Sequence, residues 1–186
     1  MAERELILGG QKSGKSRRAE QRAADWLAAA PGRRAVLIAT ARAHDDEMRQ
    51  RIARHRADRL PGLSTVEEPV ELARALAVHS APDTLVLVDC LTLWLTNLLM
   101  SPASQSDRLP EAGPPAQIAM LAMALREARG PVVLVGNEIG LGVIPLGREV
   151  RAFVDALGCL NQDMAGACDR VTLMVAGLPL TLKEPA

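Results

Sequence analysis

Short apolar runs alternate with longer amphipathic stretches along this chain. Runs such as LVLV at 85–88 and VVLV at 132–135 are apolar at every position, which favours strands covered by helices on both faces. The alternation is typical of repeated strand–helix units around a mostly parallel sheet. We predict strands at 5–8, 35–40, 84–89, 132–136 and 171–175, and helices at 15–30, 45–57, 70–79, 91–100, 116–128 and 149–165.

Two of the remaining segments have a distinctive composition. Residues 101–115, SPASQSDRLPEAGPP, are rich in Ser and Pro and lack apolar periodicity, so we predict a mobile surface loop that serves either as a connector or as a substrate lid. The helix expected at 91–100 is apolar nearly all round, which requires burial within the fold or between subunits.

Composition indicates a globular protein without a large net charge of either sign. The chain has 186 residues, 48% of them hydrophobic and 24% charged, which suits one domain spanning 1–186. Lys plus Arg and Asp plus Glu number 22 each, so nothing draws the whole surface to nucleic acid or to an anionic membrane. No apolar stretch approaches the roughly 18 residues of a membrane span, and the acidic start differs from a signal peptide. We expect a cytoplasmic protein.

The cysteines do not form a recognisable metal or disulfide pattern. Cys90, Cys159 and Cys168 include no CxxC pair, and an odd number cannot complete an intramolecular framework. We predict that all three are small buried hydrophobes in a reducing compartment.

A glycine-rich loop supplies the strongest chemical signal. It satisfies G-x-x-x-x-G-K-[ST] in full, between a strand-like and a helix-like run, with Gly9, Gly10, Gln11, Lys12, Ser13, Gly14, Lys15 and Ser16. Glycines let successive backbone N–H groups face phosphates, and the following helix points its positive end at them. Lys15 adds a charge toward the β- and γ-phosphates, and Ser16 offers a hydroxyl to Mg²⁺. The predicted fold is a P-loop NTPase of RecA-like type, a three-layer α/β/α sandwich that binds a purine nucleoside triphosphate.

A carboxylate ends the strand expected at 84–89. P-loop enzymes use such a group to orient the metal, usually through its water shell, and Asp89 stands at that position. Ser16 and Asp89 are therefore the metal-side candidates. Asp89 could instead cap the helix that starts at Leu91.

One histidine lies in a polarised segment. The helix expected at 45–57 opens with acids and becomes basic, so His55 lies one turn from Arg51 and Arg59. Neighbouring cations disfavour the imidazolium, which leaves a lone pair that could attack phosphorus. An exposed helix histidine without a chemical role is the alternative that the residues leave open.

Several blocks together resemble one family. They are GGQKSGKS, IAT, DDEM followed by RIxxH, LVLVD followed by LTLWLTNLL, GNEIGLGVIP, and LNQ, in order from about Leu6 to Lys183. The sequence resembles the bifunctional adenosylcobinamide kinases and adenosylcobinamide-phosphate guanylyltransferases of cobalamin biosynthesis. The resemblance implies phosphorylation of adenosylcobinamide by ATP or GTP, then transfer of GMP from GTP to that phosphate with release of pyrophosphate. It also implies a homotrimer.

The resemblance assigns roles to particular residues. His55 matches the histidine that carries GMP, and Lys15 shares the catalytic role. Nucleotide contacts fall on the P-loop residues and on Ala39, Thr40, Ala41, Arg56, Ala57, Asp58, Arg59, Glu67 and Asp89. One nucleotide pocket or two could serve the two reactions.

The loop after the strand at 132–136 is a further candidate. Ligands of open α/β sheets bind beyond the carboxyl ends of strands, so Asn137 and Glu138 could contact substrate or metal, unless this is only a glycine-rich turn. Two rival functions stay open. A small-molecule kinase would use the P-loop without His55, and a nucleotide-dependent switch would bind GTP and a protein partner without turning over a cobinamide.

Overall fold

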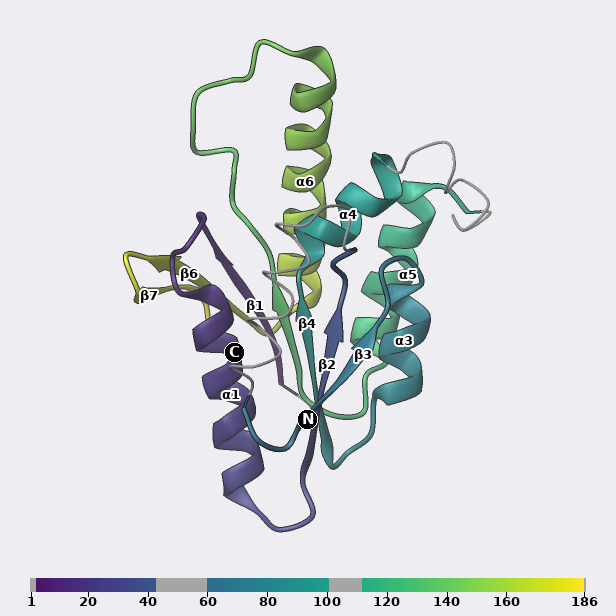
Figure 1. The fold of residues 1–186 in the computed structure, drawn as a ribbon, viewed down its shortest axis with the longest axis vertical. Coiled ribbons are helices and arrows are strands. Elements are labelled where there is room, and N and C mark those ends of the chain that lie inside the picture. Colours follow the sequence, from purple (N-terminus) through teal and green to yellow (C-terminus); the bar gives the residue numbers. More distant parts are fainter. Residues whose placement is uncertain (1–2, 43–59, 101–111, 186) are drawn as a thin grey trace.

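The computed structural model describes residues 3–42, 60–100 and 112–185, which form an α/β fold around one seven-stranded sheet (Figure 1). The strands are β1 (Arg4–Gly9), β2 (Arg34–Ala39), β3 (Leu63–Glu67), β4 (Thr84–Asp89), β5 (Val132–Val135), β6 (Arg170–Val175) and β7 (Leu178–Lys183). The helices are α1 (Lys15–Ala29), α3 (Leu72–His79), α4 (Leu91–Leu99), α5 (Pro114–Arg126) and α6 (Arg148–Ala167). The strand order is β3-β2-β4-β5-β1-β6-β7, and only the β6–β7 pair is antiparallel.

Helices cover both faces of the sheet because successive strand residues point to opposite sides. In β1, Leu6 and Leu8 pack with α3, α4, α5 and α6, whereas Ile7 packs with Ala19 and Ala23 of α1. The other parallel strands divide in the same way, so two apolar layers sandwich the sheet. This confirms the predicted P-loop NTPase class with a mostly parallel sheet.

Two edge strands escaped the sequence-based prediction. β3 has the sequence LSTVE, which is too polar for an apolar run, and it pairs on one side only, with β2. β7 is exposed along its whole length and contains Pro179, which suits an edge position. β7 follows β6 through a two-residue hairpin turn formed by Ala176 and Gly177. Both residues have positive φ, as such a turn requires.

The five predicted strands and the helices within the described residues are present, with ends shifted by one or two residues. The expected loop at 101–115 is wrong at its end, because α5 begins at Pro114, where the missing N–H of proline costs nothing. Residues 101–111 and the helix expected at 45–57 lie outside the described residues.

Burial differs among the three cysteines, and it accounts for the apolar character of α4. Cys90 and Cys168 are buried as expected, but Cys159 is exposed on α6, so that prediction was wrong. α4 packs most of its apolar residues inside the fold, including the fully buried Trp94, whereas Leu99 at its end is 43% exposed. Among the described residues, no helix combines the length and apolar character needed to cross a membrane.

The two edges of the sheet have different side chains. The amino-terminal edge carries charged pairs, among them Arg22 with the buried Glu5 and Arg4 with Asp169. At the carboxyl edge, β1 opens into the P-loop and β4 ends at Asp89. Parallel strands bring these loops together at one edge, where the candidate site lies.

Candidate nucleotide-binding site

The P-loop requires glycine where it leaves β1. Gly9 has φ of 153°, and a Cβ there would lie 2.5 Å from the carbonyl oxygen of Met174. Two backbone contacts brace the loop from outside: Gly177 N–H donates to Ser13 O at 3.0 Å, and Glu138 N–H donates to Gly9 O at 3.1 Å. The loop conformation therefore depends on β6, on the β6–β7 turn and on the segment after β5.

Lys15 and Ser16 begin α1, directly beyond Gly14. Lys15 is buried, and its Nζ donates to Gly10 O across the loop at 2.6 Å. No side chain caps the N-terminus of α1, and the positive end of this helix points at the loop, an arrangement that favours an anion. An incoming phosphate would replace the Gly10 carbonyl as the partner of the ammonium group.

Asp89 faces the P-loop from the end of β4. It accepts a hydrogen bond from Ser16 Oγ at 2.8 Å, although β5 separates β4 from β1. The alternative that Asp89 caps α4 is not supported, since the N-cap is Cys90 and no side chain caps that helix. Burial and the neighbouring Asp89 charge raise the pKa of Cys90 to about 11, so this thiol stays protonated at neutral pH.

The Ser16–Asp89 pair has the donor chemistry of a magnesium site. A hydroxyl and a carboxylate are hard oxygen ligands, and Mg²⁺ in such sites takes few protein ligands besides phosphate oxygens and water. Within the ranges that the structure covers, no group of three or more His, Cys, Asp or Glu residues could hold a metal alone. The pair fits Mg²⁺ that arrives with a triphosphate.

Thr40 ties the segment after β2 to the start of α4. Its hydroxyl donates to Cys90 O at 2.7 Å and accepts from Cys90 N–H at 2.9 Å, and its carbonyl accepts from the Asn97 amide at 2.8 Å. Ala39 pairs with Asp89 across β2 and β4. Because the Thr40 hydroxyl is engaged within the protein, a nucleotide contact here would use backbone groups or Ala41.

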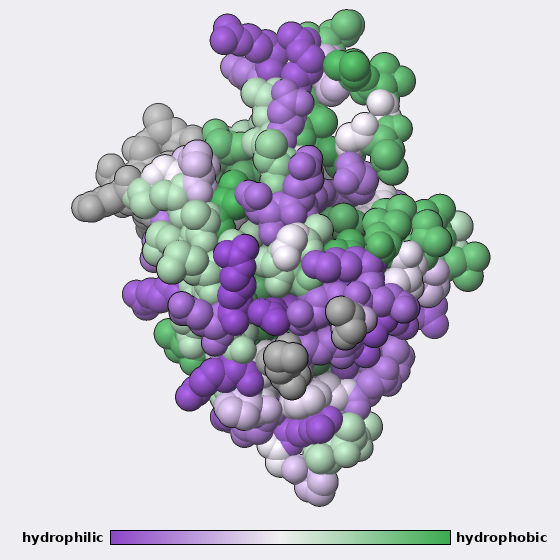
Figure 2. Space-filling model, turned by 180° about the vertical axis from the view of Figure 1, so that it is seen from behind, coloured by the Kyte–Doolittle hydropathy of each residue, from purple (hydrophilic) through white to green (hydrophobic). Residues whose placement is uncertain are grey.

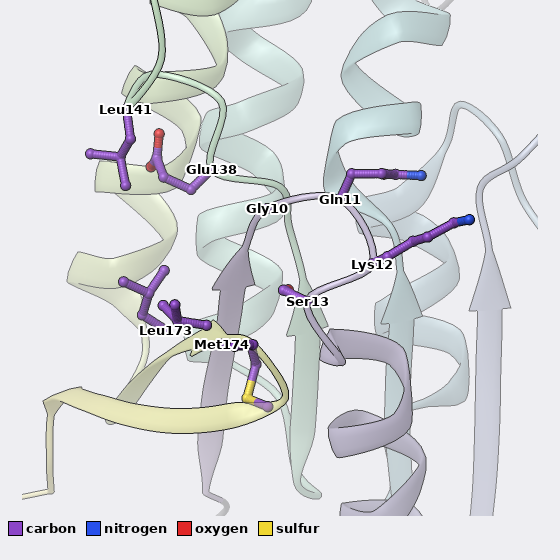
Figure 3. Close-up of a pocket in the computed structure, with 10 residues that line it drawn as sticks. Gly10, Gln11, Lys12, Ser13, Glu138, Leu141, Leu173 and Met174 are labelled. Carbon is purple, nitrogen blue, oxygen red and sulfur yellow. The ribbon is translucent and has the colours of Figure 1, made fainter.

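Asn137 and Glu138 stand beside the P-loop after β5. Asn137 N–H donates to Thr92 Oγ1 at 2.9 Å, and Glu138 Oε1 accepts from Gly140 N–H at 2.8 Å. A cavity of about 380 Å³ separates Glu138 and Leu141 from Leu173 and Met174, with the P-loop as its third wall (Figure 3). The side chains of Gln11 and Lys12 point away from the Glu138 wall in this view.

Other predicted residues lie farther off or outside the described part. Glu67 is exposed at the end of β3, four strands from β1, a separation of about 19 Å at the usual strand spacing. One nucleotide would have to be extended to contact both Glu67 and the P-loop. His55, Arg56, Ala57, Asp58 and Arg59 lie outside the described residues.

Asn161 is a polar residue of this region for which the sequence suggested no role. It is buried on α6, and its Nδ2 donates to Asn137 O at 3.1 Å. Its block, LNQ, served only as a mark of family resemblance. An asparagine on the apolar face of a predicted helix was the available signal.

The fold and the P-loop with its facing carboxylate define a nucleotide-binding enzyme of the P-loop α/β class. Residues 5–182 match the family described as cobinamide kinase / cobinamide phosphate guanyltransferase. The chain belongs to this family, so the family, enzyme class and cobalamin-biosynthesis function expected from the sequence are confirmed.

Named relatives agree over nearly the full length. The chain is 50% identical over 184 residues to the bifunctional adenosylcobalamin biosynthesis protein CobP of Pseudomonas aeruginosa, covering 98% of this chain and 99% of that one. It is 37% identical to the protein CobU of Salmonella typhimurium, over 96% and 98% of the two chains. Among solved structures, the flagellar accessory protein FlaH of Methanocaldococcus jannaschii aligns with a TM-score of 0.54 and 11% identity, over 98% of this chain and 79% of that one. That likeness concerns the fold alone.

Proposed function

We propose that this chain catalyses both reactions of its family with the residues assigned above. It first transfers the γ-phosphoryl group of ATP or GTP to the hydroxyl of adenosylcobinamide. It then transfers GMP from GTP to the new phosphate, giving adenosylcobinamide-GDP and pyrophosphate. The observation that carries the proposal is the 2.8 Å contact between Ser16 Oγ and Asp89 Oδ2, which joins the P-loop to a carboxylate two strands away.

In the kinase reaction the substrate hydroxyl attacks the γ-phosphorus and loses its proton to solvent, and the nucleoside diphosphate leaves. Phosphoryl transfer depends mainly on positioning and charge stabilisation. Lys15 and the N–H groups of the loop would hold the phosphates, and Ser16 and Asp89 would hold Mg²⁺. Bound Mg²⁺ would neutralise phosphate charge. Glu138 lines the cavity beside the P-loop, and Glu138 and its neighbour Asn137 are the candidates for contact with substrate or metal.

In the transferase reaction a nitrogen of His55 attacks the α-phosphorus of GTP and pyrophosphate leaves, so a histidine–GMP phosphoramidate forms. A phosphate oxygen of the cobinamide phosphate then attacks the same phosphorus and returns the electron pair to the imidazole. Covalent transfer divides one displacement into two. Nucleotide contacts from Ala39 to Ala41, from Arg56 to Arg59 and from Glu67 belong to this proposal.

Labelling with GTP tests the transferase half. The wild-type chain is incubated with Mg²⁺ and GTP carrying ³²P at the α-position, and the denatured protein is analysed on a gel. We expect a band labile to acid and to hydroxylamine in the wild type and in His79→Ala, and none in His55→Ala. His79 ends α3 and has no proposed role. An unlabelled wild type that binds GTP would favour the plain kinase, and a labelled His55→Ala variant would exclude His55.

We propose self-association through an apolar arm, which we define as residues 139–150. The arm stands above the rest of the fold in Figure 1, and in Figure 2 the top of the molecule shows apolar residues beside hydrophilic ones. Val143 and Leu146 are 96% and 98% exposed, and Leu141 and Ile144 are exposed as well. Exposed apolar surface of this kind marks interaction sites, and family resemblance favours a trimer.

Sedimentation velocity tests the arm. We expect the wild type to sediment as a trimer and the variant Val143→Asp/Leu146→Asp as a smaller species with unchanged circular dichroism. Val78→Asp, at an exposed apolar position on α3, is the matched control and should stay trimeric. A monomeric wild type would contradict the assignment.

The remaining parts of the proposal concern domain and location. The continuous sheet supports one catalytic domain over residues 1–186. Consumption of ATP and GTP supports action in the cytoplasm.

A further inference from the structure

We propose that Asn161 is a positioning residue of the phosphate-transfer site. Its side-chain amide would hold the segment Asn137–Glu138 in place beside the P-loop. The inference rests on the proposed function, because it takes Glu138 to contact substrate or metal there.

The donor atoms of Asn161 point at the two site residues. Asn161 is 5% exposed and shares the inner face of α6 with Leu157, Leu160 and Met164. Nδ2 donates to Asn137 O at 3.1 Å and lies 3.5 Å from Glu138 Oε2. Both neighbours are acceptors, which fixes the orientation of the amide.

The other half of the amide makes packing alone a poor explanation. Asn161 Oδ1 is buried and has no hydrogen-bond partner among the described residues. An unpaired buried oxygen lowers stability, so an apolar side chain would fill this position at less cost. The NH₂ group, which serves the site, is the part of this side chain that has partners.

The backbone around Asn161 allows a close approach. A Cβ at Gly136 would lie 3.3 Å from Asn161 Oδ1 and 3.1 Å from Leu8 Cδ2, so glycine lets α6 approach the end of β5. Asn137 N–H is held by Thr92 of α4, and Glu138 N–H by Gly9 of the P-loop. Asn161 adds a third contact to this segment, from α6.

The supported carboxylate faces the cavity beside the P-loop. Glu138 lies above Gly10 in Figure 3 and lines the cavity with it. Without the Asn161 amide, Glu138 keeps the contact from Gly140 N–H but loses a donor near Oε2. Misplacement of a reacting group by about 1 Å can cost roughly a hundred-fold in rate. Removal of the amide should therefore act on turnover through Glu138.

A double-mutant cycle on the full chain tests this coupling in the cobinamide phosphorylation assay. We expect Asn161→Ala to lower kcat by about ten- to a hundred-fold with the nucleotide KM changed less than about three-fold. In the Glu138→Gln background, the same substitution should change kcat by less than about two-fold. Gln162→Ala, an exposed amide next in sequence, is the matched control and should keep the wild-type rate.

Asn161→Asp provides a second readout that a folding defect would not mimic. The nearly isosteric carboxylate would lie beside Glu138, and repulsion raises the pKa of such a pair. The deficit of this variant should therefore shrink as the pH falls below neutral, and this recovery should vanish with Glu138→Gln. The other charged groups near Glu138 are not substituted in any of these variants. They are Lys12, which lines the same cavity, and Lys15 and Asp89.

Three results would overturn the inference. These are equal losses from Asn161→Ala in both backgrounds, a wild-type kcat for Asn161→Ala, or an unchanged rate for Glu138→Gln. Failure of the proposed function is distinguishable, because it appears as absent cobinamide phosphorylation by the wild-type chain itself.

Discussion

The two edges of the sheet use polar side chains in opposite ways. At the amino-terminal edge, Glu5 is 1% exposed and meets Arg22 and Thr172, and these partners need not change when a ligand binds. At the carboxyl edge, Lys15 donates a hydrogen bond to Gly10 O and Ser16 donates one to Asp89. These partners would change when phosphate and metal bind. One strand, β1, runs from the first edge to the second. Substitutions near the start of β1 should therefore change the stability of the fold, and substitutions beyond its end should change ligand binding.

The largest effect should come from the carboxyl edge. Lys15→Ala removes the charge on the phosphates, and we expect cobinamide phosphorylation to fall by about 10²–10³-fold, as for the loss of one oxyanion-stabilising donor. The free energy of unfolding should change by less than about 1 kcal/mol. Steady-state kinetics and urea unfolding measure both. Arg17→Ala, which removes an exposed cation from the same helix turn, should keep activity.

The next effect should come from the amino-terminal edge. Arg22 Nε and Glu5 Oε2 are 2.8 Å apart without good hydrogen-bond alignment, so the contact is an ion pair. Glu5→Gln should lower the free energy of unfolding by about 2 kcal/mol, less than for a fully buried pair because Arg22 keeps Glu3. The kcat measured at low temperature should not change. Glu184→Gln, at an exposed partner of Arg170, should alter stability by less than about 0.5 kcal/mol.

Acid should weaken the amino-terminal edge. Partial burial works in the opposite direction, but hydrogen bonds and charges from Arg170 and Arg22 hold the pKa of Glu3 below its ordinary value of 4.5. Likewise Arg4 holds the pKa of Asp169 below 3.8 despite burial. A lowered folded-state pKa contributes stability above the unfolded value and loses it as pH falls through the folded value. Urea midpoints should therefore drop between about pH 5 and 3, and the drop should be smaller in Glu3→Gln.

The smallest effect concerns thiols at the two edges. Burial raises the pKa of Cys90 to about 11 and that of Cys168 to about 12, whereas Cys159 is exposed on α6. Mass spectrometry after brief maleimide treatment should find Cys159 modified first, because the thiolate is the reacting form. All three should react in urea. If Cys90 in the native protein were labelled as fast as Cys159, the carboxyl edge of the sheet would have to open readily.

Local patterns predicted those site residues that a short stretch of sequence identifies by itself. The P-loop follows from one eight-residue motif, and Asp89 from an apolar run ended by a carboxylate. Asn161 was not predicted, because helix packing rather than sequence spacing brings it to Asn137. The Glu5 network was missed for the same reason: Glu5, Arg22 and Thr172 meet only once β1, α1 and β6 have packed. β3 and β7 lack the fully apolar run that marked the central strands.

The brace between Gly177 and Ser13 has a consequence for the order in which the protein matures. On the ribosome the P-loop is among the first segments made, while the β6–β7 turn that bonds to it follows only after most of the chain. A nascent chain that lacks β6 has neither this bond nor the Met174 carbonyl packed against Gly9. Two of the contacts that hold the binding loop in its shape therefore come from residues translated long after it.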